Sequence, residues 1–219
     1  MTTCPSLSHT FGMEHFAYFT QTHDSARRFD RAMAASTELI ADQLTRVFDF
    51  STATRIVDIG GGNGSLLKVV LTSSPATCGV VIDRDHVVAQ CTRELAGHPL
   101  ADRITAVAGD FFHTLPANGD VYVLSRILHD WTDEDCVRLL RVCRTSMSST
   151  SRLLIIERLL PEDGGVSAAS SWDMHMLAIT GGRERTSREY QRILSDAGLR
   201  LGSTHSLPLD MSLLVADPL

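Results

Sequence analysis

Residues 57–65 read VDIGGGNGS, and this stretch decides the fold of the chain. A β-branched run at residues 55–59 predicts a buried strand, which breaks into three consecutive glycines. An apolar helical pattern then begins at residues 63–65 and continues to residue 73. A strand, a glycine turn and a helix in this order allow a ligand to approach backbone at the start of a helix. The stretch therefore predicts an α/β protein with a ligand site at one edge of its sheet.

The spacing of the glycines narrows the kind of ligand. Glycines stand at positions 60, 62 and 64, but the third glycine of a dinucleotide fingerprint would fall on Ser65. This departure disfavours a nicotinamide-dependent dehydrogenase. With Asp58 two residues ahead of Gly60, the pattern resembles motif I of the S-adenosylmethionine-dependent methyltransferases. The resemblance implies a cofactor without phosphate, whose amino-acid end meets the glycine loop.

Composition limits the classes of protein that remain. The chain has 219 residues, 43% of them hydrophobic and 21% charged, which is typical of one soluble globular domain. A net charge of −6 argues against nucleic acid or an anionic membrane as partner. The sequence shows no signal peptide and no stretch long enough for a membrane span. Its five cysteines are an odd number without a C-x-x-C pair, so we expect free thiols and a cytoplasmic protein.

Alternation of strand and helix patterns predicts the fold class. We expect an α/β, Rossmann-like class I methyltransferase fold, with a mostly parallel seven-stranded sheet and helices on both faces. The last two strands follow each other after a short turn and should pair antiparallel. The expected strands are residues 55–59, 78–82, 104–108, 120–125, 152–157, 199–206 and 211–216. The expected helices are residues 24–48, 63–73, 85–96, 133–147, 168–179 and 187–196.

Polar or glycine features follow the first five strands in turn. Gly60 and Gly62 follow the first, and Asp83 follows the second at the spacing of an acid that accepts ribose hydroxyls. Asp110 and Phe111 follow the third and could hold an adenine amino group and ring face. Ligands in such sheets bind outside the carboxyl ends of the strands, so the sequence predicts a nucleoside site. A single acid of this kind would more often be a helix cap or a solvated turn.

A second signal makes the resemblance specific. Residues 124–134 read LSRILHDWTDE and resemble the H-D-W-x-D-E segment of small-molecule O-methyltransferases related to the plant caffeate and bacterial polyketide enzymes. Three further stretches agree with that family: FDRAM at 29–33, IER at 156–158 and GGRERT at 181–186. The resemblance extends from about residue 12 to residue 214 and depends on the combination of these segments.

The resemblance implies roles for three catalytic residues. His129 occupies the position of the general base, and an imidazole suits this task because its ordinary pKa lies near neutral pH. Glu157 and Glu184 match the two acids that orient this histidine. The structural alternatives are a core histidine beside Trp131, a turn acid at 157 and an ion pair between Glu184 and an arginine.

Further residues are assigned by the same resemblance. Arg28 matches an arginine that reaches the cofactor carboxylate, although it could also be a solvated helix charge. Ser125 and Trp131 match positions around the cofactor, and Asp130 flanks the adenine with Trp131. Met174 and Met176 match substrate-pocket positions, where thioethers suit a flat ring, with core packing as an equal alternative. The family implies no metal, because the base and the sulfonium leaving group suffice.

The expected domain organisation departs from that of the family. Family members carry a helical dimerisation domain ahead of the F-x-x-A-M helix, whereas this sequence begins shortly before it. We expect residues 1–23 to be a linker remnant and residues 24–219 to be the methyltransferase domain. The exposed face would include Phe11, Phe16, Tyr18 and Phe19, so we expect a homo-oligomer or a partner chain bound through this segment.

These observations predict transfer of a methyl group from S-adenosyl-L-methionine to a hydroxyl of a small aromatic or polyketide-like secondary metabolite, with S-adenosyl-L-homocysteine as product. Two alternatives remain open at the level of sequence. One is methyl transfer to carbon or nitrogen, because the pocket and not the cofactor motif sets the acceptor. The other is a cofactor-binding subunit that completes a partner enzyme without methylating.

Overall fold

The computed structural model describes residues 23–219, with side chains described for Met33 and for residues 35–219. Arg28 lies in the first described helix, but its side chain is outside this part. The aromatic residues expected to form an N-terminal contact surface, Phe11, Phe16, Tyr18 and Phe19, also lie outside the described residues.

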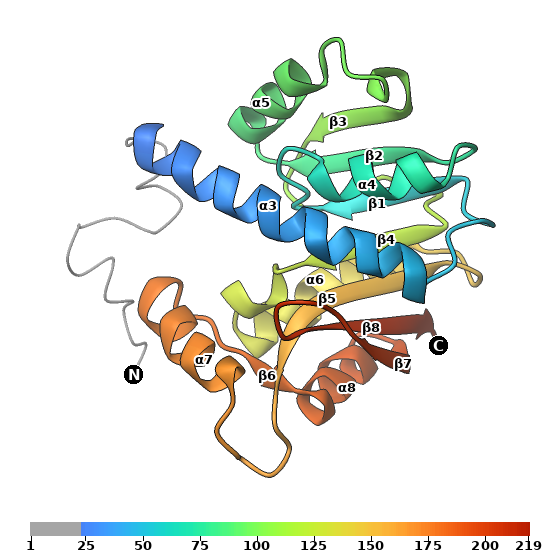
Figure 1. Ribbon diagram of the computed structural model, residues 1–219. Helices are drawn as coiled ribbons and strands as arrows, with labels where there is room; N and C mark the ends of the chain where they lie inside the picture. Colours follow the sequence, from blue (N-terminus) through green and yellow to red (C-terminus); the bar gives the residue numbers. More distant parts are fainter. Residues whose placement is uncertain (1–22) are drawn as a thin grey trace.

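A mixed sheet forms the centre of the described part (Figure 1). Its main path has the strand order β3-β2-β1-β4-β5-β8-β7, and β6 pairs with β5 off this path. The strands β1 to β5 are parallel along this path, whereas β8 runs antiparallel to both of its neighbours. The strands are β1 (Arg55–Ile59), β2 (Cys78–Asp83), β3 (Ile104–Ala108), β4 (Val121–Ser125), β5 (Arg152–Leu160), β6 (Arg185–Thr186), β7 (Leu199–Ser206) and β8 (Met211–Pro218).

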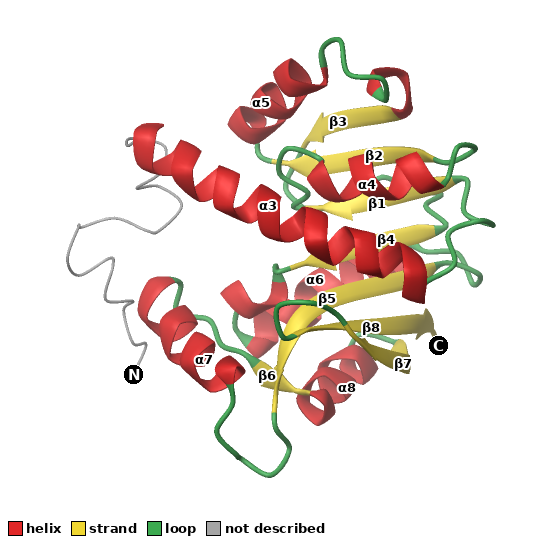
Figure 2. Ribbon diagram, viewed as in Figure 1, coloured by secondary structure: helices red, strands yellow, loops and turns green. Residues whose placement is uncertain are grey.

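Helices cover both faces of this sheet (Figure 2). One core cluster joins apolar side chains of α3, α4 and α5 to one face, and a second joins those of α6 and α8 to the other. The helices are α3 (His23–Val47), α4 (Ser65–Ser73), α5 (Asp85–Leu95), α6 (Asp133–Ser146), α7 (Ala168–Ile179) and α8 (Ser187–Asp196), with two short 3-10 turns, η1 (Ala101–Arg103) and η2 (Leu128–Asp130).

The predicted fold class is confirmed, with small differences at the ends of elements. Helix α4 begins at Ser65, at the end of the predicted range, because Gly64 has a left-handed φ of 74° that cannot continue a helix. Strand β5 extends to Leu160, three residues beyond the predicted end. Strand β6 and the turn η2 were not predicted, because two or three residues carry no periodic signal.

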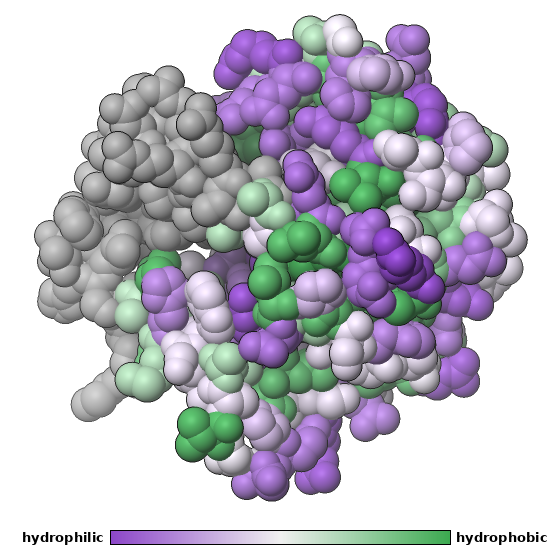
Figure 3. Space-filling model, viewed as in Figure 1, coloured by the Kyte–Doolittle hydropathy of each residue, from purple (hydrophilic) through white to green (hydrophobic). Residues whose placement is uncertain are grey.

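The surface hydropathy, the helix lengths and the cysteines of the described part bear on the expectations from sequence. Figure 3 shows hydrophilic and hydrophobic residues mixed over the face that α3 crosses. None of the helices described here is long and apolar enough to cross a lipid bilayer. Cys78 is exposed and Cys91, Cys136 and Cys143 are buried, and all four are free thiols.

Helix α3 is held to the sheet by its apolar stripe, which gives a first prediction. Leu44 is fully buried in the cluster shared with α4. We expect Leu44→Ala to lower the free energy of unfolding by about 2–5 kcal/mol, because it leaves a cavity between α3 and the sheet. Leu39→Ala is the matched control on the same helix, since Leu39 is 58% exposed. Denaturant titration of both variants checks the prediction, and equal losses would contradict it.

Candidate active site

The glycine loop and the first strand-end acid lie side by side at the carboxyl edge of the sheet. The backbone N–H of Gly60 donates to the carbonyl of Ile82 at 2.8 Å. The N–H of Gly62 donates to Oδ2 of Asp83 at 3.0 Å. The structure therefore brings together Gly60, Gly62 and Asp83 as the sequence predicted, and the carboxylate of Asp83 helps to hold the loop.

Steric contacts explain why this loop is built from glycine. A Cβ on Gly60 would lie 2.5 Å from a side-chain carbon of Ile127, and one on Gly61 would lie 2.5 Å from the carboxylate of Asp58. Gly62 has a φ of +59°, and a Cβ built there would meet no atom within 4 Å. Open space therefore adjoins the backbone at Gly62, where a ligand could approach it.

Asp58 lies beneath the loop and was not among the predicted site residues. Its side chain is buried, and burial together with the negative charge of Asp83 raises the pKa of its carboxyl to about 7. Its Oδ2 atom has no hydrogen-bond partner. The acid two residues ahead of the first glycine was the available signal, but nothing in the sequence separated a buried support from a ligand contact.

Aromatic rings lie after β3 and after η2. The rings of Phe111 and Trp131 have centroids 6.4 Å apart, and Phe112 packs edge-on against Trp131 at 4.7 Å. Asp110 is exposed and accepts a hydrogen bond from the N–H of Phe112 at 2.9 Å. That hydrogen bond lowers the pKa of Asp110. The predicted pair of Asp110 and Phe111 thus adjoins Trp131, which the sequence placed in the same site.

His129 stands in η2 between two fully buried carboxylates. Its Nδ1 atom lies 3.2 Å from Oε2 of Glu157 and 3.4 Å from Oε1 of Glu184. The other oxygen of Glu157 accepts hydrogen bonds from the backbone N–H groups of Ile127 at 3.0 Å and Leu128 at 2.8 Å. Glu157 therefore supports the turn and faces the imidazole at once. These three residues are brought together as the resemblance implied.

The structural alternative for Glu184, an ion pair with an arginine, is not seen in the described part of the chain. Glu184 makes no ion pair with an arginine in the described part, because Arg183 pairs with Glu189 and Arg185 pairs with Asp133. Asp173 on α7 accepts a hydrogen bond from the backbone N–H of Glu184 at 2.8 Å, which fixes the segment that carries this acid.

The charges of the trio are strongly coupled. Burial lowers the pKa of His129, but the nearby carboxylates of Glu157 and Glu184 outweigh it and raise the pKa to about 9. Burial raises the pKa of Glu157 to about 7, although the charge of His129 opposes this shift. The imidazole therefore holds its proton more firmly than the sequence suggested, and its protonation is set by the two carboxylates.

The same trio has the spacing of a small metal site. One ligand atom from each of His129, Glu157 and Glu184 lies within 4.8 Å of the others. However, one oxygen of Glu157 is already occupied by backbone N–H groups. The arrangement suits a proton held on Nδ1, which leaves Nε2 to face other groups. Asp130 lies on that side, with Oδ1 4.0 Å from Nε2, and burial raises its pKa to about 6.

A rigid frame around His129 was missed by sequence reasoning. Arg185 is fully buried and donates to the carbonyls of Leu128 at 2.9 Å and Trp131 at 2.7 Å, on either side of the histidine. The N–H of Arg183 donates to the carbonyl of His129 at 2.9 Å. Both arginines belong to the GGRERT segment, in which the resemblance implied a role for Glu184 but none for its two neighbours.

The remaining predicted residues are dispersed. Ser125 lies at the end of β4 with a buried, unpartnered hydroxyl oxygen. Met174 is 74% exposed whereas Met176 is buried, because residues two apart on a helix do not share a face. The structure therefore does not bring the two methionines to one wall.

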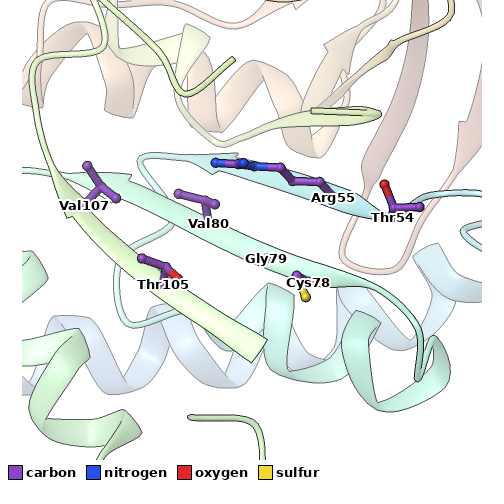
Figure 4. Close-up of a pocket in the computed structure, with 7 residues that line it drawn as sticks. All are labelled: Thr54, Arg55, Cys78, Gly79, Val80, Thr105 and Val107. Atoms are coloured by element: carbon purple, nitrogen blue, oxygen red, sulfur yellow. The ribbon is translucent and has the colours of Figure 1, made fainter. Parts of the chain in front are cut away.

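Two cavities lie away from the glycine loop. One of about 310 Å³ lies against β1, β2 and β3, and Figure 4 shows Arg55, Val80 and Val107 among its lining residues. None of its lining residues belongs to the candidate site. The other, of about 530 Å³, is lined in part by Asp173 and Glu184 and so adjoins the back of the trio.

The close approach of Gly182 gives a second prediction. A Cβ at this position would lie 1.9 Å from the carbonyl oxygen of His129 and 2.9 Å from the Cα of Asp130. We expect Gly182→Ala to destabilise the protein by about 1–3 kcal/mol, because backbone atoms must move apart. Gly165→Ala, which meets only the side chain of Asp163, should be nearly neutral. Thermal unfolding compares the stabilities of the two variants. An unchanged melting temperature in Gly182→Ala would show that the backbone around His129 can move to accept a Cβ.

Comparison with known proteins agrees with this geometry. Residues 4–200 match the family described as the O-methyltransferase domain. A 3-amino-4-hydroxybenzoate 4-O-methyltransferase from Streptomyces cremeus is 43% identical over 96% of this chain and 58% of its own length. The crystal structure of LaPhzM is similar, with a TM-score of 0.92 and 35% identity over 99% of this chain and 65% of that one.

A further solved structure shows a relative with ligands. NcsB1, an O-methyltransferase from neocarzinostatin biosynthesis, was crystallised with S-adenosylmethionine and 2-hydroxy-5-methyl naphthoic acid. Its TM-score is 0.89, with 29% identity over 98% of this chain and 64% of that one. The chain spans about three fifths of the length of the curated relatives it matches. The family match over most of the sequence shows that the chain belongs to the O-methyltransferase domain family.

Proposed function

We propose that this chain transfers a methyl group from S-adenosyl-L-methionine to a hydroxyl of a small aromatic secondary metabolite. One observation carries the proposal: an imidazole held by two buried carboxylates stands at the same sheet edge as an open glycine loop. The relative from Streptomyces cremeus, named for methylation of an aromatic hydroxyl, supports the choice of acceptor.

The residues at the glycine loop fit the cofactor. Gly62 presents backbone beside open space, and Asp83 presents a carboxylate at the end of β2 for the ribose hydroxyls. Phe111 and Trp131 offer ring faces for the adenine, with Asp110 and Asp130 beside them. The buried hydroxyl of Ser125 lacks a partner in the described part and could meet a polar group of the cofactor. Gly60 and Arg28 complete the proposed cofactor set. When bound, S-adenosylmethionine supplies an electrophilic methyl group.

The chain's own residues would hold and move one proton. His129 accepts the proton of the acceptor hydroxyl, so that the oxygen can form its new bond to carbon while the sulfur–carbon electron pair returns to sulfur. Glu157 and Glu184 keep Nδ1 protonated and Nε2 directed at the acceptor, and they stabilise the imidazolium that results. Much of the remaining acceleration comes from holding the methyl group in line with the oxygen.

Three further expectations remain proposals. Met176, with Met174 at the exposed side of α7, would contact the acceptor ring. Residues 1–23 would mediate self-association or contact with a partner chain, and the protein would be cytoplasmic. Two alternatives are methyl transfer to carbon or nitrogen and a role as a non-methylating subunit. Assays with matched acceptors distinguish them, because the first gives a different methylated product and the second gives none.

Asp83 tests the cofactor site. We expect Asp83→Ala to weaken binding of S-adenosylhomocysteine by about 10–150-fold, because it removes charge-assisted hydrogen bonds worth about 1.5–3 kcal/mol. Calorimetry measures this affinity directly. Asp85→Ala, at an exposed acid two residues on, is the control and should bind normally. Unchanged affinity in Asp83→Ala would remove Asp83 from the site.

His129 tests the chemistry. We expect His129→Ala to lose about 10²–10⁴-fold in turnover while its affinity for S-adenosylhomocysteine is kept. In the wild type kcat/KM should rise with pH up to about 9, because the raised pKa of His129 leaves little neutral imidazole at lower pH. This rise should be absent from the variant, and EDTA should leave the wild-type rate unchanged. A variant with wild-type rate and pH profile would show that His129 is not the base.

A further inference from the structure

Two arginines on adjacent parallel strands near His129 form no ion pair in the described part of the chain. Arg126 comes directly after β4, and Arg158 lies within β5, next to Glu157. The Nε atoms of both are buried and make no hydrogen bond. A guanidinium that is partly removed from water and forms no ion pair is costly, so the pair requires an explanation.

Arg126 is held entirely by neutral groups of α3. Its guanidinium donates to the hydroxyl oxygens of Ser36, at 2.8 Å, and Thr37. It also contacts Met33 at the carbonyl oxygen, 3.5 Å away, and at the sulfur, 3.3 Å away. The residue has a φ of 57°, in the left-handed region that non-glycine residues rarely adopt. The backbone is thus strained at the point that aims this cation toward α3.

Arg158 is held by a ring. Its guanidinium carbon lies 4.2 Å from the centroid of Trp172 on α7, so one face of the cation is covered by the indole. The side chain is half-buried. This stacking fixes the plane of the guanidinium but leaves its edge, where the N–H groups point, unsatisfied at Nε.

The two cations are near each other. Ser125 pairs with Ile156 across the β4–β5 ladder, and the N–H of Arg126 donates to the carbonyl of Ile156 at 2.9 Å. Arg126 therefore continues alongside Glu157, one residue before Arg158. Burial lowers the pKa of Arg126, the charge of Glu157 opposes this shift, and repulsion from Arg158 adds to it.

The nearby carboxylates do not accept hydrogen bonds from either arginine in the described part of the chain. Glu157 faces His129 and the N–H groups of η2, and Glu184 faces His129. Asp58 lies beneath the glycine loop, and the charge of Arg126 lowers its pKa without an ion pair between the two. These acids moderate the charge, but none of them forms an ion pair with Arg126 or Arg158 in the described part.

We propose that Arg126 and Arg158 together bind the carboxylate of the acceptor, so that the substrates of this chain are aromatic hydroxy acids. The inference rests on the proposed function, because it places the acceptor hydroxyl at His129. Guanidinium edges match a carboxylate geometrically and electrostatically. The ring of such an acid would lie between His129 and the arginines, on the side where α3 and α7 contribute Met33 and Trp172. The same carboxylate chemistry is present in the cofactor, so the test must separate the two sources.

Binding of matched ligands in the presence of saturating S-adenosylhomocysteine tests the proposal without relying on turnover. The probes are 4-hydroxybenzoate and 4-hydroxybenzamide, which differ in the carboxylate alone, and calorimetry gives their affinities. We expect wild type to bind the acid at least about tenfold more tightly than the amide. Arg126→Gln and Arg158→Gln should each weaken binding of the acid about 10–100-fold and change that of the amide less than about threefold.

Two further variants keep the result interpretable. Arg158→Lys should recover part of the affinity for the acid, because it restores the charge without the planar edge. Arg141→Gln, at an exposed arginine that caps the α8 end through the carbonyl of Asp196, should behave as wild type. The proposal is overturned if wild type binds acid and amide equally or binds neither. It is also overturned if the Gln variants lose both probes alike, or lose S-adenosylhomocysteine instead of the acid, which would make the cofactor the source of the carboxylate.

A turnover assay on the same probes separates this inference from the proposed function. Selective methylation of the acid by wild type, with a raised KM and little change in kcat in the Gln variants, supports both. Selective binding of the acid without methylation of any hydroxyl supports the carboxylate site and contradicts the proposed function. Methylation of acid and amide at equal kcat/KM supports the function and overturns the carboxylate site.

Discussion

The buried contact of His129 with Glu157 and Glu184 is the constraint on which the rest of the site depends. A carboxylate without solvent keeps its charge only when other groups compensate it, and here one imidazole serves two acids. The backbone around His129 must therefore be held in place. Arg185, Arg183 and Gly182 do this from one segment, since their contacts fix the carbonyls on both sides of His129 and that of His129 itself.

The fold itself could be predicted almost completely from the sequence. The strands β1 to β5 alternate with helical patterns, and the buried strands are continuous apolar runs, which is what a parallel sheet covered on both faces requires. Helices α6 and α8 are capped by Thr132 and Thr186. Each threonine side chain accepts a hydrogen bond from the backbone N–H of the third helical residue. Short elements such as β6 and η2 escape prediction, because tertiary contacts and not periodicity define them.

The sequence could predict which candidate residues lie near one another, but not the contacts that they make. Strand order brings Gly62 and Asp83 together, and the resemblance named His129 with its two acids. Nothing in the sequence shows that Asp83 binds the glycine loop or that Arg185 points at the turn that carries His129. Those contacts cross between segments far apart in the chain, and local pattern carries no information on them. Met174 and Met176 do not share a face, because they lie two residues apart on α7.

Electrostatic interactions link the trio of His129, Glu157 and Glu184 to the two arginines, which belong to different sequence motifs. The imidazole and its two acids carry one net negative charge when His129 is protonated and two when it is neutral. Arg126 and Arg158 lie close to these groups, so their positive charges offset the negative charge and favour loss of the proton from His129. A bound sulfonium would act in the same direction and would favour release of the proton from His129. A carboxylate bound to the arginines would act in the opposite sense and keep the imidazole basic. The basicity of His129 in this view depends on which ligands are present, and the free protein, with its raised pKa at His129, lies between the sulfonium-bound and carboxylate-bound cases.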